Sequence, residues 1–234
     1  MRIFIVILIF FHLTSFSQDK EVKDITSYPN PSIIFNLNYN SWFSPPTDMK
    51  ISPLSMGIDI YGVYPLLGKE QFISLAAGGG FSVQNIKSDS YLINTDSSYF
   101  VKLPTDLEYN KNKITTVFFD IPIEIRLRSR PNPRDKAGIV RKRNFRFALG
   151  VKIGYNIQRY IKYDGEDYRS FNYQNPIKFK EYRLNNILLY RYGIYSRIGV
   201  GKISLTAYYA LSPFFIKEKG PSLRPFSIGL SINI

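Results

Sequence analysis

The feature that most constrains this chain is a strict alternation of apolar and polar residues, clearest in residues 117–128, VFFDIPIEIRLR. Every second residue from Val117 to Leu127 is apolar, and four of the residues in the other set are charged. A period of two is the signature of a β-strand with one apolar and one polar face. In a soluble barrel or sandwich the apolar face points into the fold, whereas in a membrane barrel it points outward to lipid.

The same alternation recurs along the chain and defines eight predicted strands: 33–43, 54–64, 71–84, 114–128, 145–163, 187–200, 203–215 and 226–234. Most of them are long enough to cross a bilayer at a tilt, which takes ~9–11 residues. The fifth carries the longest predicted apolar face, which runs from Phe145 through Ile157 to Ile161 and Tyr163. The apolar face of the seventh is predicted to end with Phe215.

The predicted connections alternate in length. Long loops are expected at 44–53, 85–113, 164–186 and 216–224, and short turns near 67–69 and 201–202. Bacterial outer-membrane barrels have long external loops and short periplasmic turns. The connection 129–144 departs from this pattern, because it is long although it lies on the side of the turns.

Residues 1–17, MRIFIVILIFFHLTSFS, have the three parts of a secretory signal peptide. Arg2 supplies a positive start, an apolar run follows, and Ser15-Phe16-Ser17 forms a small-x-small cleavage signal. We expect a periplasmic tail at 18–31 and a barrel at 32–234. Since no other segment approaches the ~18 apolar residues of a helical span, the expected location, the cell outer membrane, requires crossing by strands.

The polar face of the predicted strands is rich in small residues, such as those of Ser74–Gly80, which suit a narrow interior better than a solvated surface. The sequence therefore predicts an all-β fold, an eight-stranded antiparallel transmembrane β-barrel with a packed, charged lumen. Buried charges need partners, so we expect lumen ion pairs among Asp59, Asp120, Glu124, Lys152, Arg191 and Arg197. The alternative is a secreted lipocalin-like barrel with its apolar residues inside. Pro122 has no N–H for a ladder and predicts a local bulge.

Four stretches carry a resemblance to a known family: FFDIPIEIRLRSR, NFRFALGVKIGYNI, YRYGIYSRIGVGKISLTAYYALSPFF and the terminal PFSIGLSINI. They resemble the PorT-like family of small outer-membrane β-barrels of Bacteroidota, over about 33–234. The resemblance implies an outer-membrane barrel and a link to type IX protein secretion. It contains no catalytic signature. Outer-membrane barrels usually end in an aromatic residue, and this chain departs from that pattern with Ile234.

The composition argues against catalysis. The chain has no cysteine, and its one histidine, His12, lies in the predicted signal peptide. A mature chain without histidine has no Ser-His mechanism, and Asp120 and Glu124 are better explained as ion-paired than as a catalytic pair. The acidic residues of 164–167 are better explained as a solvated loop than as a Ca²⁺ site. We therefore predict no enzyme activity, cofactor or metal site.

A basic cluster lies between 126 and 146, where Asp135 is the one acidic residue. Nucleic acid is not an expected partner in the outer membrane, so the available counter-charges are anionic lipid headgroups or an acidic periplasmic protein. The residues predicted to bind such a partner are Arg134, Lys136, Arg141, Lys142 and Arg143. The alternative is that 129–144 is a solvated turn.

Two function classes remain open from the sequence. The first is a non-catalytic accessory or scaffold barrel, and the second is a small channel or a barrel that binds a ligand or lipopolysaccharide. The crowded interior of an eight-stranded barrel favours the first class. The aromatic and basic loop at 164–186 is expected either to contact external ligands or to fold over the mouth of the barrel.

Overall fold

The computed structural model describes residues 32–67, 72–129, 145–169 and 175–234, and within them every regular element is a β-strand. The predicted signal peptide, the tail, most of the turn near 67–69 and residues 130–144 lie outside the described residues. The strands are β1 (Ser32–Phe43), β2 (Met56–Leu67), β3 (Ile73–Lys87), β4 (Ser90–Asn94), β5 (Ser98–Lys102), β6 (Tyr109–Arg128), β7 (Phe145–Glu166), β8 (Pro176–Glu181), β9 (Tyr190–Val200), β10 (Ile203–Ala210) and β11 (Arg224–Asn233).

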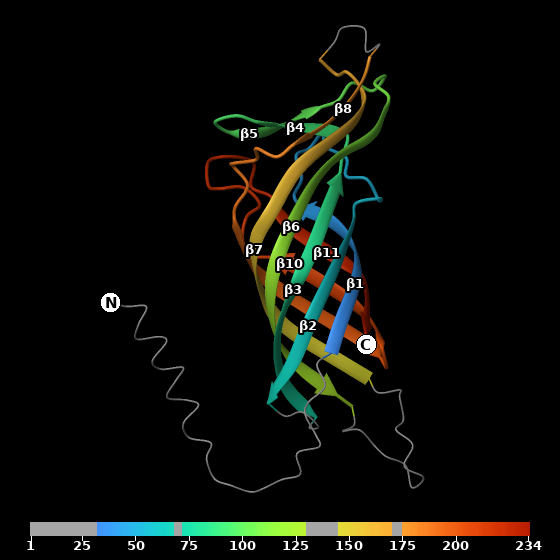
Figure 1. The fold of residues 1–234 in the computed structure, drawn as a ribbon, viewed down its shortest axis with the longest axis vertical. Coiled ribbons are helices and arrows are strands. Elements are labelled where there is room, and N and C mark those ends of the chain that lie inside the picture. The colour runs from blue at the N-terminus through green and yellow to red at the C-terminus, as the bar shows by residue number, and fades with distance from the viewer. Residues whose placement is uncertain (1–31, 68–71, 130–144, 170–174) are drawn as a thin grey trace, which may run out of the picture. The chain divides into compact units, whose positions relative to one another are not determined.

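Eight of these strands close into an antiparallel barrel. Figure 1 shows this barrel from the side. The circuit runs β1-β2-β3-β6-β7-β9-β10-β11 and returns to β1. The first and last strands close it, with Ile34 paired to Asn233 and Phe43 to Arg224. The predicted all-β, eight-stranded antiparallel barrel is therefore confirmed.

The alternation of the sequence becomes an alternation between the outside and the inside of the barrel. On β6, Ile121 is 47% exposed and Ile123 is 39% exposed, whereas Asp120 and Glu124 are buried. The same division holds along β2 and β9, where apolar side chains are exposed and the residues between them are buried. The apolar face of the barrel strands thus points outward.

The upper part of β7 does not follow the predicted face. A bulge places Val117 opposite Gln158 and Phe118 opposite Asn156, which leaves Ile157 as an extra residue in β7. An extra residue reverses which face the following residues occupy. Ile161 and Tyr163, predicted on the same outward face as Ile157, are consequently fully buried.

Pro122 is not at a bulge, contrary to the expectation from its missing N–H. Its pairing with Lys152 of β7 continues in register. On the other side, the β3–β6 ladder pairs Ala77 with Ile123 and Gly80 with Asp120, and skips the positions between. The missing hydrogen bond is therefore absorbed by a local gap in one ladder, with no shift of register.

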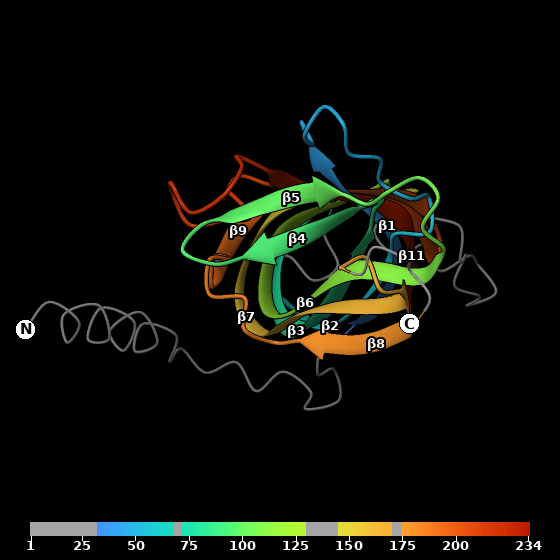
Figure 2. The ribbon, with the colours of Figure 1, turned by 90° about the horizontal axis from the view of Figure 1, so that it is seen from above.

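At the end of the barrel with the long loops, a group of apolar side chains forms what we call the cap. Its buried members are Trp42, Met49, Ile86, Tyr91, Leu92, Leu103, Leu107, Ile114, Ile161, Tyr163, Leu184, Ile187, Phe214, Phe215 and Leu223. The β4–β5 hairpin lies across this end of the barrel, and β8 extends the sheet beside β7 (Figure 2). Phe215, predicted on the outer face of a longer seventh strand, lies in the cap because β10 ends at Ala210.

Candidate functional site in the barrel interior

The first group of ionisable residues in the interior is centred on Asp120. Arg191 holds this carboxylate with two nitrogens, since its Nε lies 3.1 Å from Oδ1 and its Nη2 lies 2.6 Å from Oδ2. Tyr61 donates a hydrogen bond of 2.9 Å to the same carboxylate, and its hydroxyl accepts a 3.0 Å hydrogen bond from Lys152. All four residues are buried. Two-point contacts between Arg and carboxylate are among the strongest in proteins.

A glycine makes room for the pair of Asp120 and Arg191. The two residues stand on β6 and β9, and Gly154 of the intervening β7 is paired with both. A Cβ at Gly154 would collide with Oδ1 of Asp120 and lie 3.1 Å from Cγ of Arg191. The small residues of β7 therefore let side chains from its two neighbours meet across it.

The second group is centred on Glu124, which lies four residues after Asp120 on β6 and therefore closer to the turn end of the barrel. Arg197 contacts both carboxylate oxygens, at 2.6 and 2.7 Å, and Tyr195 donates a 2.8 Å hydrogen bond. Arg126 forms a further short ion pair with this carboxylate. Three donors therefore surround one buried acid, which offsets the cost of removing its charge from water.

Asp59 is the member of the predicted set that joins no ion pair among the described residues. Its Oδ2 instead accepts hydrogen bonds from Asn38 at 2.8 Å and from Asn36 at 3.2 Å, both on the neighbouring strand β1. Lys152, one of its expected partners, lies 3.8 Å from Asp120. The structure thus brings together Asp120 with Lys152 and Arg191, and Glu124 with Arg197, while Asp59 is held by amides.

Aromatic rings complete the environment of the buried cations. Nζ of Lys152 lies 4.1 Å from the ring centroid of Tyr208, and the guanidinium of Arg191 lies 3.8 Å from that of Phe118. A cation over a ring face is attracted by the ring quadrupole. These contacts help to compensate the surplus of positive charge inside the barrel.

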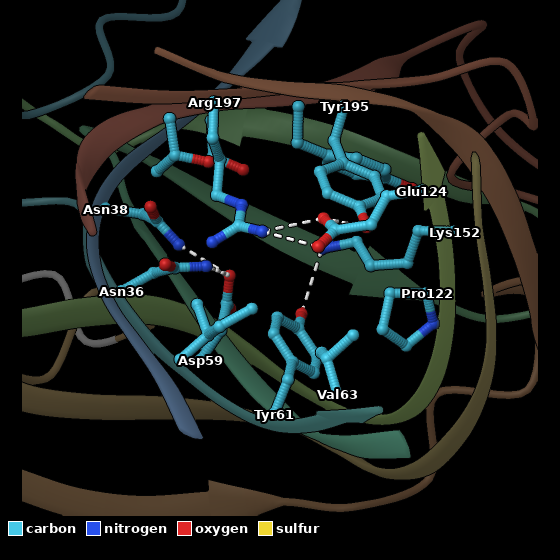
Figure 3. Close-up of a pocket in the computed structure, with 14 residues that line it drawn as sticks. Asn36, Asn38, Asp59, Tyr61, Val63, Pro122, Glu124, Lys152, Tyr195 and Arg197 are labelled. Atoms are coloured by element: carbon cyan, nitrogen blue, oxygen red, sulfur yellow. Dashed lines mark hydrogen bonds and ion pairs between the residues drawn. The ribbon is translucent and has the colours of Figure 1, made fainter. Parts of the chain in front are cut away.

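The space left between the two groups is small. Figure 3 shows side chains from opposite walls pointing toward one another, with Asn36, Asn38 and Asp59 facing Arg197, and Tyr61 facing Lys152. The cavity between them has a volume of about 20 Å³. A cavity needs ~10–15 Å³ to hold one water molecule. Oδ1 of Asn36, Nε of Arg197 and the hydroxyl of Tyr208 have no hydrogen-bond partner among the described residues. The cavity is therefore polar and large enough for one water molecule.

At the turn end the interior becomes strongly basic. Arg126, Arg128, Arg146 and Arg197 line a cavity of about 30 Å³, together with Ser204 and Asn233. The residues predicted to bind a partner from the adjacent turn, Arg134, Lys136, Arg141, Lys142 and Arg143, lie outside the described residues. The described part of this end nevertheless has the same sign of charge.

The described residues contain no group of three or more acidic or histidine side chains that could hold a metal ion. They also contain no helix with the length and hydropathy of a membrane span. In the loop at 164–186, Tyr168 and Phe179 pack against the cap, while Phe171 and Tyr173 lie outside the described residues.

Sequence reasoning missed the tyrosines of the interior and Arg126. Tyr61 lies two residues after Asp59, and Tyr195 two residues before Arg197, so the alternation itself places them on the inner face. Arg126 follows Glu124 with the same spacing. The signal was present, but tyrosine is also common at the outer surface of membrane barrels, where aromatic residues form girdles.

Comparison of the chain with protein-family models, curated proteins and solved structures finds no match. The fold and the interior contacts alone therefore define the class: a closed eight-stranded antiparallel barrel with apolar side chains outside.

Proposed function

We propose that this chain is a non-catalytic integral outer-membrane β-barrel protein with a packed, charged lumen. One observation carries the proposal, the apolar outer surface of the barrel. On β6 the outward side chains from Val117 to Leu127 are all apolar. Ten residues of antiparallel strand at ~3.4 Å each, tilted by ~35–45°, span roughly 25 Å along the barrel axis. An apolar band of about this height is what a bilayer requires.

The soluble alternative, a lipocalin-like barrel, fits these facings poorly. It needs its apolar side chains inside and polar ones outside, whereas Ile153, Leu205 and Leu230 are each more than half exposed. Soluble monomers rarely expose apolar patches larger than a few hundred Å². Every strand of this barrel carries exposed large apolar side chains, which in water would drive aggregation.

The channel alternative is disfavoured by the filled interior. Two ion-paired groups occupy the middle of the barrel, and the cavity between them has room for about one water molecule. The cap adds a second, apolar obstruction at the long-loop end. A scaffold or accessory role needs no open path, and it agrees with the resemblance to PorT-like barrels, which points to protein secretion or surface assembly.

The proposed partner surface is the basic end of the barrel. We place an acidic periplasmic partner, or inner-leaflet headgroups, at Arg134, Lys136, Arg141, Lys142 and Arg143 of the 129–144 turn. The arginines of the adjacent interior support the basic character of this end. Salt screens attraction between charges over a Debye length of ~8 Å at physiological ionic strength, so an association through these charges should weaken as salt is raised.

Cell fractionation tests the proposal directly. We expect the mature chain in the outer membrane, with a gel mobility that changes on heating, and no ion conductance in planar bilayers. Crosslinking in native membranes should recover a partner with the wild-type chain. A variant in which the five turn residues are neutralised should not recover this partner, although its gel mobility should still change on heating. Recovery of the chain as a soluble periplasmic protein contradicts the membrane assignment, and an unchanged crosslinking pattern contradicts the partner assignment.

A further inference from the structure

Four lysines stand side by side on the outer wall near the cap. Lys87 of β3 is paired with Lys113 of β6, Lys113 with Lys162 of β7, and Lys162 with Lys180 of β8. These four strands are adjacent in the sheet, and Figure 1 shows β6, β7 and β8 running together at the upper end. We call this set the lysine row. Residues paired across antiparallel strands point to the same face of a sheet.

No ion pair between described residues includes a lysine of the row. The lysine row therefore has no acidic partner in the described part of the chain. The nearest acids in the ladders are already engaged. Asp164, in the next row above, pairs with Lys178 at 3.3 Å, and Glu181 accepts a hydrogen bond from Tyr91. Like charges directly opposite one another destabilise a sheet. An uncompensated row of four is therefore a surface that favours an anion.

One member of the row, Lys113, has a lowered pKa. Burial, followed by repulsion from Lys162, Lys87, Lys111 and Lys180, lowers the pKa of Lys113, which lies above the apolar band. A bound anion would relieve this repulsion. The protein itself supplies no negative charge that offsets this repulsion among its described ion pairs.

The height of the row relative to the apolar band identifies the kind of anion. Lys113 precedes the first residue of the band on β6, Val117, by four residues, which corresponds to roughly 10 Å along the barrel axis at a strand tilt of ~40°. Nζ of Lys113 donates a 2.9 Å hydrogen bond to Asn85, one row closer to the band, and Nζ of Lys180 lies 5.2 Å from the ring centroid of Tyr160 in that same row. These two amines therefore point toward the membrane surface, where lipid headgroups lie.

We propose that the lysine row binds the phosphate groups of anionic lipid headgroups in the leaflet at the long-loop end of the barrel. This inference rests on the proposed membrane barrel and adds to it a ligand class and a site. The distance between neighbouring strands, ~4.8 Å, lets one phosphate contact two adjacent lysines. The row accommodates two such groups, so a lipid carrying two phosphates, or a pair of lipids with one each, fits it.

The test uses the full mature chain folded in nanodiscs of phosphatidylcholine mixed with phosphatidate, and counts by native mass spectrometry the phosphatidate that each barrel retains. The central pair is changed in Lys113→Gln/Lys162→Gln. The matched control, Lys102→Gln/Lys217→Gln, removes the same charge from exposed lysines of the long-loop end. A lysine near an anionic surface contributes roughly a fivefold change in affinity, so we expect retention to fall by roughly 25-fold in the first variant and little in the control.

Three further measurements test whether binding requires the lysine charge, the phosphate group and the lipid chains. Lys113→Arg/Lys162→Arg keeps both charges and should retain phosphatidate, whereas diacylglycerol, which has the same chains without phosphate, should not be retained by the wild type. Inorganic phosphate at an equal concentration should not displace the lipid. Equal retention by the Gln variant and the wild type overturns the inference, and displacement by inorganic phosphate overturns its lipid part. Failure of the wild type to insert into nanodiscs overturns the membrane barrel, and the inference with it.

Discussion

Tyr195 on β9 donates a 2.8 Å hydrogen bond to Glu124 on β6, although β7 runs between the two strands. Gly150 of β7 is paired with both residues. A Cβ at this position would lie 2.9 Å from Cβ of Glu124 and 2.9 Å from Cε1 of Tyr195, and would collide with the carbonyl oxygen of Ile123. Because that oxygen belongs to the backbone, it cannot rotate away. The contact between Glu124 and Tyr195 therefore depends on a glycine between them.

Gly150→Ala is expected to lower the free energy of unfolding by roughly 1–3 kcal/mol, as overpacking of a filled interior does. Urea unfolding in lipid vesicles, followed by the fluorescence of Trp42, measures the change. Gly62→Ala is the matched control, since Gly62 is exposed and the nearest atom to its added Cβ, the carbonyl oxygen of Gly79, is 3.9 Å away. Equal unfolding curves for the two variants would show that the space beside Glu124 is not limiting.

Asp120→Asn is expected to lower the free energy of unfolding by roughly 3–5 kcal/mol, because it leaves the buried cations Arg191 and Lys152 without their carboxylate. Asp164→Asn removes the carboxylate of the more exposed pair with Lys178 and should cost at most ~1 kcal/mol. The same urea titration compares the two. If both changes cost the same, the interior pair does not stabilise the barrel in the way its burial implies.

An arginine introduced on the outer face should lower the free energy of unfolding, and the loss should grow with the depth of the arginine in the bilayer. Ile153 is paired with Ile121, near the middle of the apolar band on β6, so Ile153→Arg should cost roughly 2–4 kcal/mol. Gln158 is exposed and paired with Val117 at the top of the band, and Gln158→Arg should cost ~0–1 kcal/mol. Folding yield and stability in vesicles measure both. A harmless Ile153→Arg would mean that this face does not contact lipid.

The cap should open in alkali before the barrel does. Tyr163, which pairs with Phe179 of β8 beyond the apolar band, has its pKa raised to about 12, first by burial and then by the neighbouring Tyr168 and Glu166. Burial also raises the pKa of Tyr91. An unfolded tyrosine ionises near ~10, so the contribution of Tyr163 is complete below that pH and is lost as pH rises to about 12.

Quenching of Trp42 by acrylamide reports this opening, because the single tryptophan of the chain is buried in the cap against Phe100 and Phe214. Quenching should rise between roughly pH 10 and 12, while the gel mobility of the barrel stays that of the folded form. In Tyr163→Phe the rise should move to higher pH. Quenching that begins at neutral pH, or that is unaffected by this change, would contradict a role for Tyr163.

The strands and their closure could be predicted from the sequence because successive side chains of a strand point to opposite faces, so that residue type alternates with the environment of each face. The reversal after Ile157 could not, since a bulge adds one residue without changing residue types, and Ile161 and Tyr163 continue the odd-numbered apolar pattern. Their burial reflects the cap, whose residues come from strand ends and loops that are far apart in the sequence.

The choice of partners in the interior depended on register as well. Asp120 meets Arg191 because both are paired with Gly154, a three-strand alignment that the sequence does not specify. Asp59 is paired with Asn36 across the β1–β2 ladder and lies on the side of the barrel that offers amides. A list of buried charges was therefore predictable, and the pairing of Asp59 was not.

The central claim, that the outer face of this barrel contacts lipid, is tested most directly by a depth scan of β6. The chain has no cysteine, so single cysteines from 117 to 127 accept a spin label one at a time in native outer membranes. We predict that labels at the outward positions are accessible to oxygen, most strongly near Ile121 and Ile123, and shielded from a water-soluble nickel complex, with labels at inward positions shielded from both. Nickel accessibility at the outward positions as high as at the exposed Lys217 would contradict the membrane barrel.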